Sequence, residues 1–174
     1  MGGKSRMKWI GFLLTAAACA GVGQWAASQI HRRVHLLECS ISLVEILKSQ
    51  LSFTMAEPAV ILREIEEKKA LKDLSFLAVC LHLCKQGTAF PVAWRESLET
   101  DGLDPLTVED RQILTDLGNV LGSTGLQGQI DQLNLLQSRL KSQLEAASQC
   151  YATNGKLYRS LGLMGGLLLV ILLW

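Results

Sequence analysis

The 174-residue chain has little charge, few aromatic residues and few prolines. Only 19% of its residues are charged and 6% are aromatic, and it contains three prolines. This low charge, combined with 49% apolar residues, excludes an intrinsically disordered chain. Seventeen basic and sixteen acidic residues leave a formal net charge of +1, which excludes a general nucleic-acid binder because such proteins carry a marked basic excess.

Signature motifs of nucleotide-binding and hydrolytic enzymes are also missing. The sequence contains no GxxxxGK[ST], GxSxG or HExxH motif. The glycines of the tract LGNVLGSTGLQG follow no strand pattern, so we interpret them as helix ends and close contacts rather than as a phosphate-binding loop. We therefore expect a protein that is not an enzyme, without catalytic residues, cofactor, resident metal or small-molecule substrate.

The cysteine pattern does not indicate a disulfide framework. Five cysteines give an odd count without the regular spacing of small secreted domains. This pattern favours a reducing compartment.

The apolar residues are concentrated at the two ends of the chain. Residues 9–30 contain no charge and would extend about 33 Å as a helix, which is enough to cross a bilayer core. Residues 158–174 carry Arg159 as their single charged side chain. We predict a transmembrane helix at 9–30, preceded by a basic tail at 1–8, and a second transmembrane segment at 158–174.

The first segment also has features of a cleaved signal. Small residues at positions 16–18 precede Cys19, as in a lipoprotein processing site. The apolar run continues beyond Cys19, however, and Arg32 and Arg33 follow it directly, which favours an uncleaved anchor. An exported or lipoprotein-like adaptor is the alternative hypothesis.

The region between the two ends reads as helix throughout. Residues 31–157 hold thirteen of the basic and all sixteen acidic residues, a net charge of −3. Apolar residues recur every three or four positions along 34–55, 71–84 and 126–151, and no alternating run is long enough for a strand. Short connections between the helices favour an antiparallel bundle. Local signals at the helix ends are Thr107 as an N-cap, Pro58 and Pro91 at helix starts, and Gly87 and Gly122 at helix ends.

Two cysteine–histidine groups are candidate metal sites. His31, His35 and Cys39 are spaced to share one helix face, and a metal would accept these ligand types. No fourth ligand is indicated, so we favour a helix face just outside the membrane. In the second group, Cys80 and Cys84 lie on a leucine stripe and are predicted as core residues, whereas His82 points away from them.

Basic and small residues flank or occupy the predicted anchors. If the first and last helices are antiparallel, a basic collar meets at one end of the bundle and faces anionic lipid headgroups. The small residues of the terminal segment would allow close packing of membrane helices. The collar consists of Arg32, Arg33, Lys156 and Arg159, and the small residues are Gly162, Gly165 and Gly166.

Three tracts resemble a known family. LGNVLGSTGLQGQI, EILKSQLSFTMAEPAVILREI and above all the ending KLYRSLGLMGGLLLVILLW resemble stage III sporulation protein AB of endospore-forming bacteria. The resemblance covers essentially the whole chain. One departure is Gly125, where an acidic residue is expected, and it removes any capping role for that side chain.

The resemblance implies a fold, a location and a role. It implies an all-α antiparallel bundle similar to the type II secretion F domain, held by both ends in the mother-cell membrane around the forespore. Residues 31–157 would lie in the mother-cell cytoplasm. The protein would be a non-enzymatic platform or scaffold subunit of a secretion-like channel between the two cells. Its partners would be membrane lipids and other proteins of the same operon, including a secretion-ATPase-like protein, with no nucleic acid.

Helix lengths locate the end of the bundle that lies farthest from the basic collar. This far end should contain a corner after the first long helix and the turn before the last one. We predict it as the partner-binding region, with Ser52, Glu57 and Pro58 at the corner and Gly122 and Gly125 in the turn.

Overall fold

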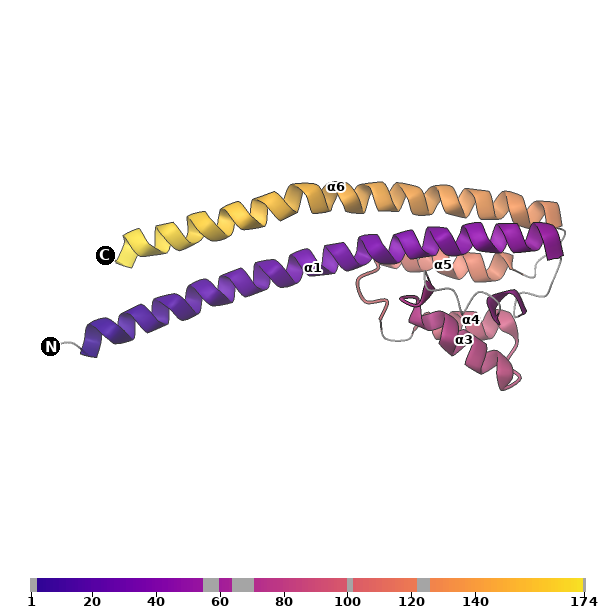
Figure 1. Ribbon diagram of the computed structural model, residues 1–174, viewed down its shortest axis with the longest axis horizontal. Coiled ribbons are helices and arrows are strands. Elements are labelled where there is room, and N and C mark those ends of the chain that lie inside the picture. Colours follow the sequence, from indigo (N-terminus) through magenta and orange to yellow (C-terminus); the bar gives the residue numbers. More distant parts are fainter. Residues whose placement is uncertain (1–2, 55–59, 64–70, 100–101, 122–125, 174) are drawn as a thin grey trace. The chain divides into compact units, whose positions relative to one another are not determined.

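A computed structural model shows helices joined by turns and loops, and no strand, in the part of the chain that it describes (Figure 1). The all-α prediction is confirmed for these residues. The elements are α1 (Gly3–Thr54), α3 (Ser75–Lys85), α4 (Phe90–Ser97), α5 (Val108–Val120) and α6 (Leu126–Leu173), and residues 60–63 are also helical. The backbone is described for 3–54, 60–63, 71–99, 102–121 and 126–173, and side chains for 25, 28–53, 60–63, 71–99, 102–121 and 127–153.

The chain divides into two compact units. One contains residues 1–31 and 147–174, and therefore consists of the beginning of α1 and the end of α6. The other contains residues 32–146, with the remainder of both long helices and all the shorter ones.

Within residues 32–146, α1 and α6 run antiparallel. Lys48 near the end of α1 donates to Gln137 Oε1 at 3.0 Å, and Gln137 Nε2 donates to Glu45 Oε1 at 2.9 Å. Earlier on α1, Arg33 donates to Gln143, which lies later on α6, at 3.0 Å. Ascending positions on one helix thus meet descending positions on the other, which confirms the predicted antiparallel arrangement for this unit.

The apolar stripes predicted from the sequence form the core of this unit. Burial of a leucine side chain contributes about 1.5–3 kcal/mol, so these stripes are the main source of its stability. Deeply buried residues of this core include Leu37, Leu43, Val44 and Leu47 of α1, Phe76 and Leu77 of α3, Leu114 and Leu117 of α5, and Leu133 and Leu140 of α6.

Trp94 fixes the position of α4. Its indole ring is buried and meets Phe76 edge-to-face at a centroid distance of 5.2 Å, and its Nε1 donates to the Leu114 carbonyl oxygen at 2.8 Å. The ring lies directly against Gly118 of α5, where any side chain would collide with it. The predicted role of Pro91 is confirmed, because it occupies the first turn of α4.

The ends of α3 show one correct prediction and one error. Gly87 follows the helix with φ at +92°, a conformation that glycine adopts without strain, so its predicted capping role is confirmed. The apolar pattern starts at Leu71, but α3 begins only at Ser75, and Leu71–Leu74 form a tight turn closed by the Leu74 amide and the Leu71 carbonyl at 3.0 Å. Both leucines are buried in this turn. The apolar spacing at Leu71 and Leu74 therefore correctly indicated burial but wrongly predicted a helix.

The two predicted anchors have helical backbones inside α1 and α6. Among the residues that the structure describes fully, no helix is both long and apolar enough to cross a membrane. Nearly all side chains of 9–30, and all those of 158–174, lie outside that part, so both anchors stay predictions.

Candidate functional site

A reciprocal capping box begins α5. The Thr107 amide donates to Asp110 Oδ2 at 2.9 Å, and the Asp110 amide donates to Thr107 Oγ1 at 3.3 Å. This confirms Thr107 as the N-cap and satisfies two of the amides that a helix start leaves without partners. Arg111 also donates to the Leu103 carbonyl oxygen at 3.0 Å, which holds the preceding loop against the helix.

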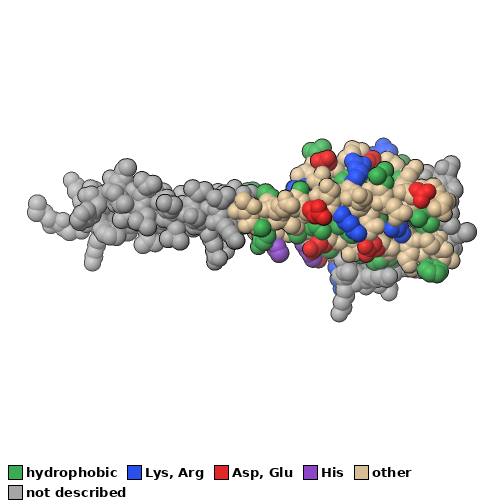
Figure 2. All heavy atoms as spheres, turned by 90° about the horizontal axis from the view of Figure 1, so that it is seen from above, with side chains coloured by type: hydrophobic (Ala, Val, Ile, Leu, Met, Phe, Trp, Pro, Cys, Tyr) green, Lys and Arg blue, Asp and Glu red, His purple; other side chains and the backbone are tan. Residues whose placement is uncertain are grey.

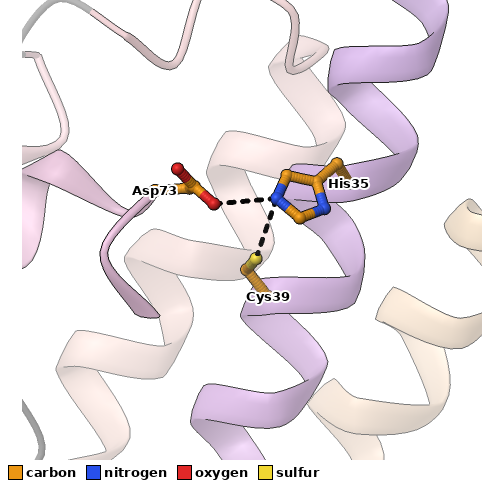
Figure 3. Close-up of side chains that lie close together, drawn as sticks. All are labelled: His35, Cys39 and Asp73. Atoms are coloured by element: carbon orange, nitrogen blue, oxygen red, sulfur yellow. Dashed lines mark hydrogen bonds and ion pairs between the residues drawn. The ribbon is translucent and has the colours of Figure 1, made fainter. Parts of the chain in front are cut away.

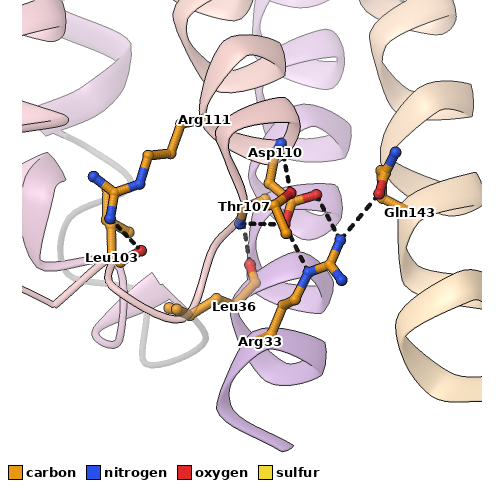
Figure 4. A network of polar contacts seen from close by, with 8 residues as sticks. Arg33, Leu36, Leu103, Thr107, Asp110, Arg111 and Gln143 are labelled. Carbon is orange, nitrogen blue, oxygen red and sulfur yellow. Dashed lines mark hydrogen bonds and ion pairs between the residues drawn. The ribbon is translucent and has the colours of Figure 1, made fainter. Parts of the chain in front are cut away.

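The same Asp110 carboxylate receives a two-pronged contact from Arg33 of α1 (Figure 4). Arg33 Nε donates to Oδ2 at 2.7 Å, and Nη2 donates to Oδ1 at 3.1 Å. Nη2 also donates to Gln143 Oε1 at 3.0 Å. The Asp110 side chain is 0% exposed and that of Arg33 is 20% exposed, so this contact joins α1, α5 and α6 largely away from water.

Asp110 stays charged in spite of its burial. Burial by itself raises the pKa of this carboxyl, but the hydrogen bonds from Arg33 and Thr107, with the Arg33 charge, outweigh that effect and lower its pKa. An ionised carboxylate held by a bidentate guanidinium is a strong and geometrically specific contact. We call the Arg33–Asp110–Gln143 group the polar clasp.

The polar clasp changes the predicted role of Arg33. The sequence predicts Arg33 in a collar that faces lipid headgroups, but its guanidinium binds Asp110 and Gln143 inside the 32–146 unit. Arg32 is exposed and remains available for the collar. The side chains of Lys156 and Arg159 lie outside the described residues.

The other predicted site residues fall mostly outside the described part. Ser52 is exposed near the end of α1, and its predicted partner-binding role stays a prediction. Nothing is described of Glu57, Pro58, Gly122 and Gly125, nor of the surroundings of Gly162, Gly165 and Gly166 in α6.

A second polar group lies further along α1 (Figure 3). His35 and Cys39 are one helical turn apart, and Asp73 belongs to the tight turn before α3. His35 Nε2 lies 2.8 Å from Asp73 Oδ2 and 3.8 Å from Cys39 Sγ. Of the candidate ligands considered from the sequence, His31 is not in this group, and its ring instead contacts that of Tyr151 at 5.7 Å.

This group is unsuited to nucleophilic catalysis. In a cysteine–histidine–aspartate relay the thiol and the carboxylate contact opposite ring nitrogens, whereas here both contact Nε2. Burial, reinforced by the negative charges of Asp73 and Glu38, raises the pKa of the Cys39 thiol, which disfavours the reactive thiolate.

The second predicted cysteine group lies in and beside the core. Cys80 is fully buried, which confirms its predicted place in the core. Burial, together with neighbouring Cys84, raises the pKa of its thiol to about 12. Cys84 is half-buried. His82 is exposed, with a ring nitrogen 3.0 Å from Gln86 Nε2.

The surface of the described part carries mixed charges. Figure 2 shows acidic and basic side chains interspersed on one face, without a large area of one sign. Large apolar side chains are nevertheless exposed at single positions, most strongly Phe53 at the end of α1 and Val108 at the start of α5, each 87% exposed.

These features define an all-α protein built on two long helices, with a partly buried ion pair that joins α1, α5 and α6. The family model for stage III sporulation protein AB matches residues 8–174, and the chain therefore belongs to this family of sporulation proteins. The resemblance seen in the sequence is thus confirmed. Neither the curated proteins nor the solved structures searched contained a match.

Proposed function

We propose that this sporulation protein is a non-enzymatic scaffold subunit of a secretion-like channel apparatus between mother cell and forespore. The polar clasp carries the proposal, because its buried polar groups serve to fix three helices relative to one another. Family membership supplies the sporulation context. In this proposal the bundle is similar in role to the type II secretion F domain and links a secretion-ATPase-like partner to the membrane part.

The proposal includes attachment to the mother-cell membrane by both ends. Residues 9–30 and 158–174 would be the two anchors, with the bundle on the cytoplasmic side. Arg32, Lys156 and Arg159 would contact anionic headgroups, each worth on the order of 1 kcal/mol. Gly162, Gly165 and Gly166 would let the terminal segment pack closely against another membrane helix.

Thiol labelling tests this orientation. Cys150 is exposed, so a membrane-impermeant thiol reagent should label it only after the cells are permeabilised. A Cys150→Ser variant is the control that assigns the signal to this position. Labelling of Cys150 in intact cells would instead support the exported or lipoprotein-like adaptor.

The end of α1 supports a partner-binding far end. Ser52 and Phe53 are both exposed there, and the Phe53 ring is in contact with water over most of its surface. Aromatic side chains are enriched among the residues that dominate binding energy at protein interfaces, which makes Phe53 the residue to test. The secretion-ATPase-like protein of the same operon is the partner that we propose for it.

Charge at this far end should block spore formation. Loss of a buried aromatic contact weakens binding by about 30-fold or more, so Phe53→Asp, alone or with Ser52→Glu, should abolish heat-resistant spores. Protein level and membrane association should stay unchanged.

Val108→Asp is the matched control for this test. Val108 is as exposed as Phe53, but it lies at the start of α5, two residues before Asp110 of the polar clasp. An acidic residue is tolerated in the first turn of a helix, so Val108→Asp should not disturb α5. It should sporulate normally. Normal sporulation of the Phe53→Asp strain would refute the far-end assignment.

A further inference from the structure

Three side chains with metal-binding atoms converge beside α1. The ring nitrogen of His35, the Cys39 sulfur and a carboxylate oxygen of Asp73 all lie within 4.8 Å of one another. Figure 3 shows that the three side chains point toward one another from two separate segments of the chain. We propose that they bind a zinc ion, with a water molecule as the fourth ligand.

The donor set favours zinc among common cellular cations. A thiolate and an imidazole are ligands that Zn²⁺ accepts readily, whereas Mg²⁺ and Ca²⁺ require oxygen ligands. The thiolate and the Asp73 carboxylate would together balance the charge of the ion. Three protein ligands plus water is a coordination that zinc adopts regularly.

The two ligand separations that involve His35 Nε2 require little rearrangement, and the sulfur and the carboxylate oxygen lie within 4.8 Å of each other. In a tetrahedral zinc site the ligand atoms are separated by roughly 3.3–3.6 Å. The sulfur–nitrogen separation of 3.8 Å is close to this range, and the nitrogen–oxygen separation of 2.8 Å must open by about 0.6 Å. Asp73 can move by this amount because its side chain is 61% exposed on a turn.

The surroundings of His35 fit a metal ligand. Its second ring nitrogen, Nδ1, lies 3.9 Å from Glu38 Oε2. A carboxylate that accepts a hydrogen bond from the non-coordinating nitrogen commonly orients a metal-binding histidine, and Glu38 would have to approach by about 1 Å to do so. The same geometry that excludes a nucleophilic relay therefore suits a cation, since both the thiol and the carboxylate already approach the coordinating Nε2.

A bound ion would tie the turn before α3 to α1. An ion can reach this site from solvent, because the His35 side chain is 51% exposed, although Cys39 is buried. Zinc that binds only the folded chain stabilises it by mass action. The predicted effect is a rise in melting temperature with increasing zinc.

Metal titration of the purified, tag-free, full-length chain tests the site. We expect one zinc per chain, and with Co²⁺ the absorption of a tetrahedral site that contains a thiolate. Cys39→Ser, His35→Gln and Asp73→Ala should each weaken Zn²⁺ binding by about 100-fold or more, at least the loss seen when an outer-shell partner is removed.

Cys84→Ser and His82→Gln are the matched controls, because they remove the same residue types from α3 and should bind zinc as the wild type does. Asp73→Ala changes an exposed turn, so its helix content and metal-free melting should stay unchanged. No bound zinc, a cobalt spectrum without a thiolate signal, or full affinity in Asp73→Ala would overturn the proposal.

Discussion

Replacing Arg33 with methionine should lower the free energy of unfolding by about 3 kcal/mol, because it leaves the buried Asp110 carboxylate without its cation. For a chain of this length the loss corresponds to a fall in melting temperature of roughly 6–12 °C. Thermal unfolding of the purified full-length chain, followed by circular dichroism, measures it. Methionine keeps much of the aliphatic volume of arginine, so the change tests the charge rather than the packing.

Arg32→Met is the control for this experiment. Arg32 neighbours Arg33 in sequence but is exposed, and its replacement should change stability by less than about 0.5 kcal/mol. The double variant Arg33→Met/Asp110→Asn should lose less than the sum of the two single variants, since the neutral amide no longer needs a counter-charge. Additive losses would show that the two side chains are not coupled.

Acid provides a second check on the same pair. Because the folded pKa of Asp110 is below its ordinary value of 3.8, its stabilising contribution is complete above that pH and is lost as the pH falls through the folded pKa. The difference in stability between the wild type and Asp110→Asn should therefore be largest near neutrality and shrink below about pH 4. A constant difference across this range would contradict the lowered pKa.

Replacing Gly118 with alanine should destabilise the bundle by about 1–3 kcal/mol. The new Cβ would lie within 2.5 Å of Trp94 Cγ, and the ring cannot move away easily because it is buried and donates to the Leu114 carbonyl. Thermal unfolding and the fluorescence of the buried indole both report the change. The loss is expected even though alanine is the better helix former by about 1 kcal/mol.

Gly128→Ala separates packing from helix propensity. Gly128 lies in α6 with open space around it, so the same substitution there should stabilise the chain by up to about 1 kcal/mol. Opposite signs for the two variants are the expected result. A stabilised Gly118→Ala variant would show that Trp94 does not pack against α5 in this way.

Local sequence signals predicted most of the secondary structure. The spacing of apolar residues along 34–55 and 126–151 predicted the long helices, since one stripe can be buried only if the period matches a helix. Thr107 and Gly87 predicted helix ends for equally local reasons, an oxygen that caps amides and a backbone that adopts positive φ. The family could be recognised from the tracts around Gly122 and the carboxyl terminus.

The candidate sites could not be predicted in the same way. Arg33 and Asp110 are 77 positions apart in the sequence. Each has an ordinary local explanation, because Arg33 is a basic residue next to a predicted membrane segment and Asp110 is an acidic residue in the first turn of a helix. Asp73 is likewise 38 positions from His35, inside a stretch that the apolar pattern assigned to helix. No spacing rule connects residues on different elements.

The sequence by itself determined most of the helices, the caps at Thr107 and Gly87, the apolar ends and the family, because these depend on period, composition and neighbouring residues. Only the tertiary structure decided that Arg33 turns to Asp110 and Gln143, that Trp94 lies on Gly118, and that Asp73 meets His35 and Cys39. The physical reason is that each of these contacts depends on which faces of separate helices and turns pack together. That choice is made by burial across the whole unit rather than by any local segment of the chain.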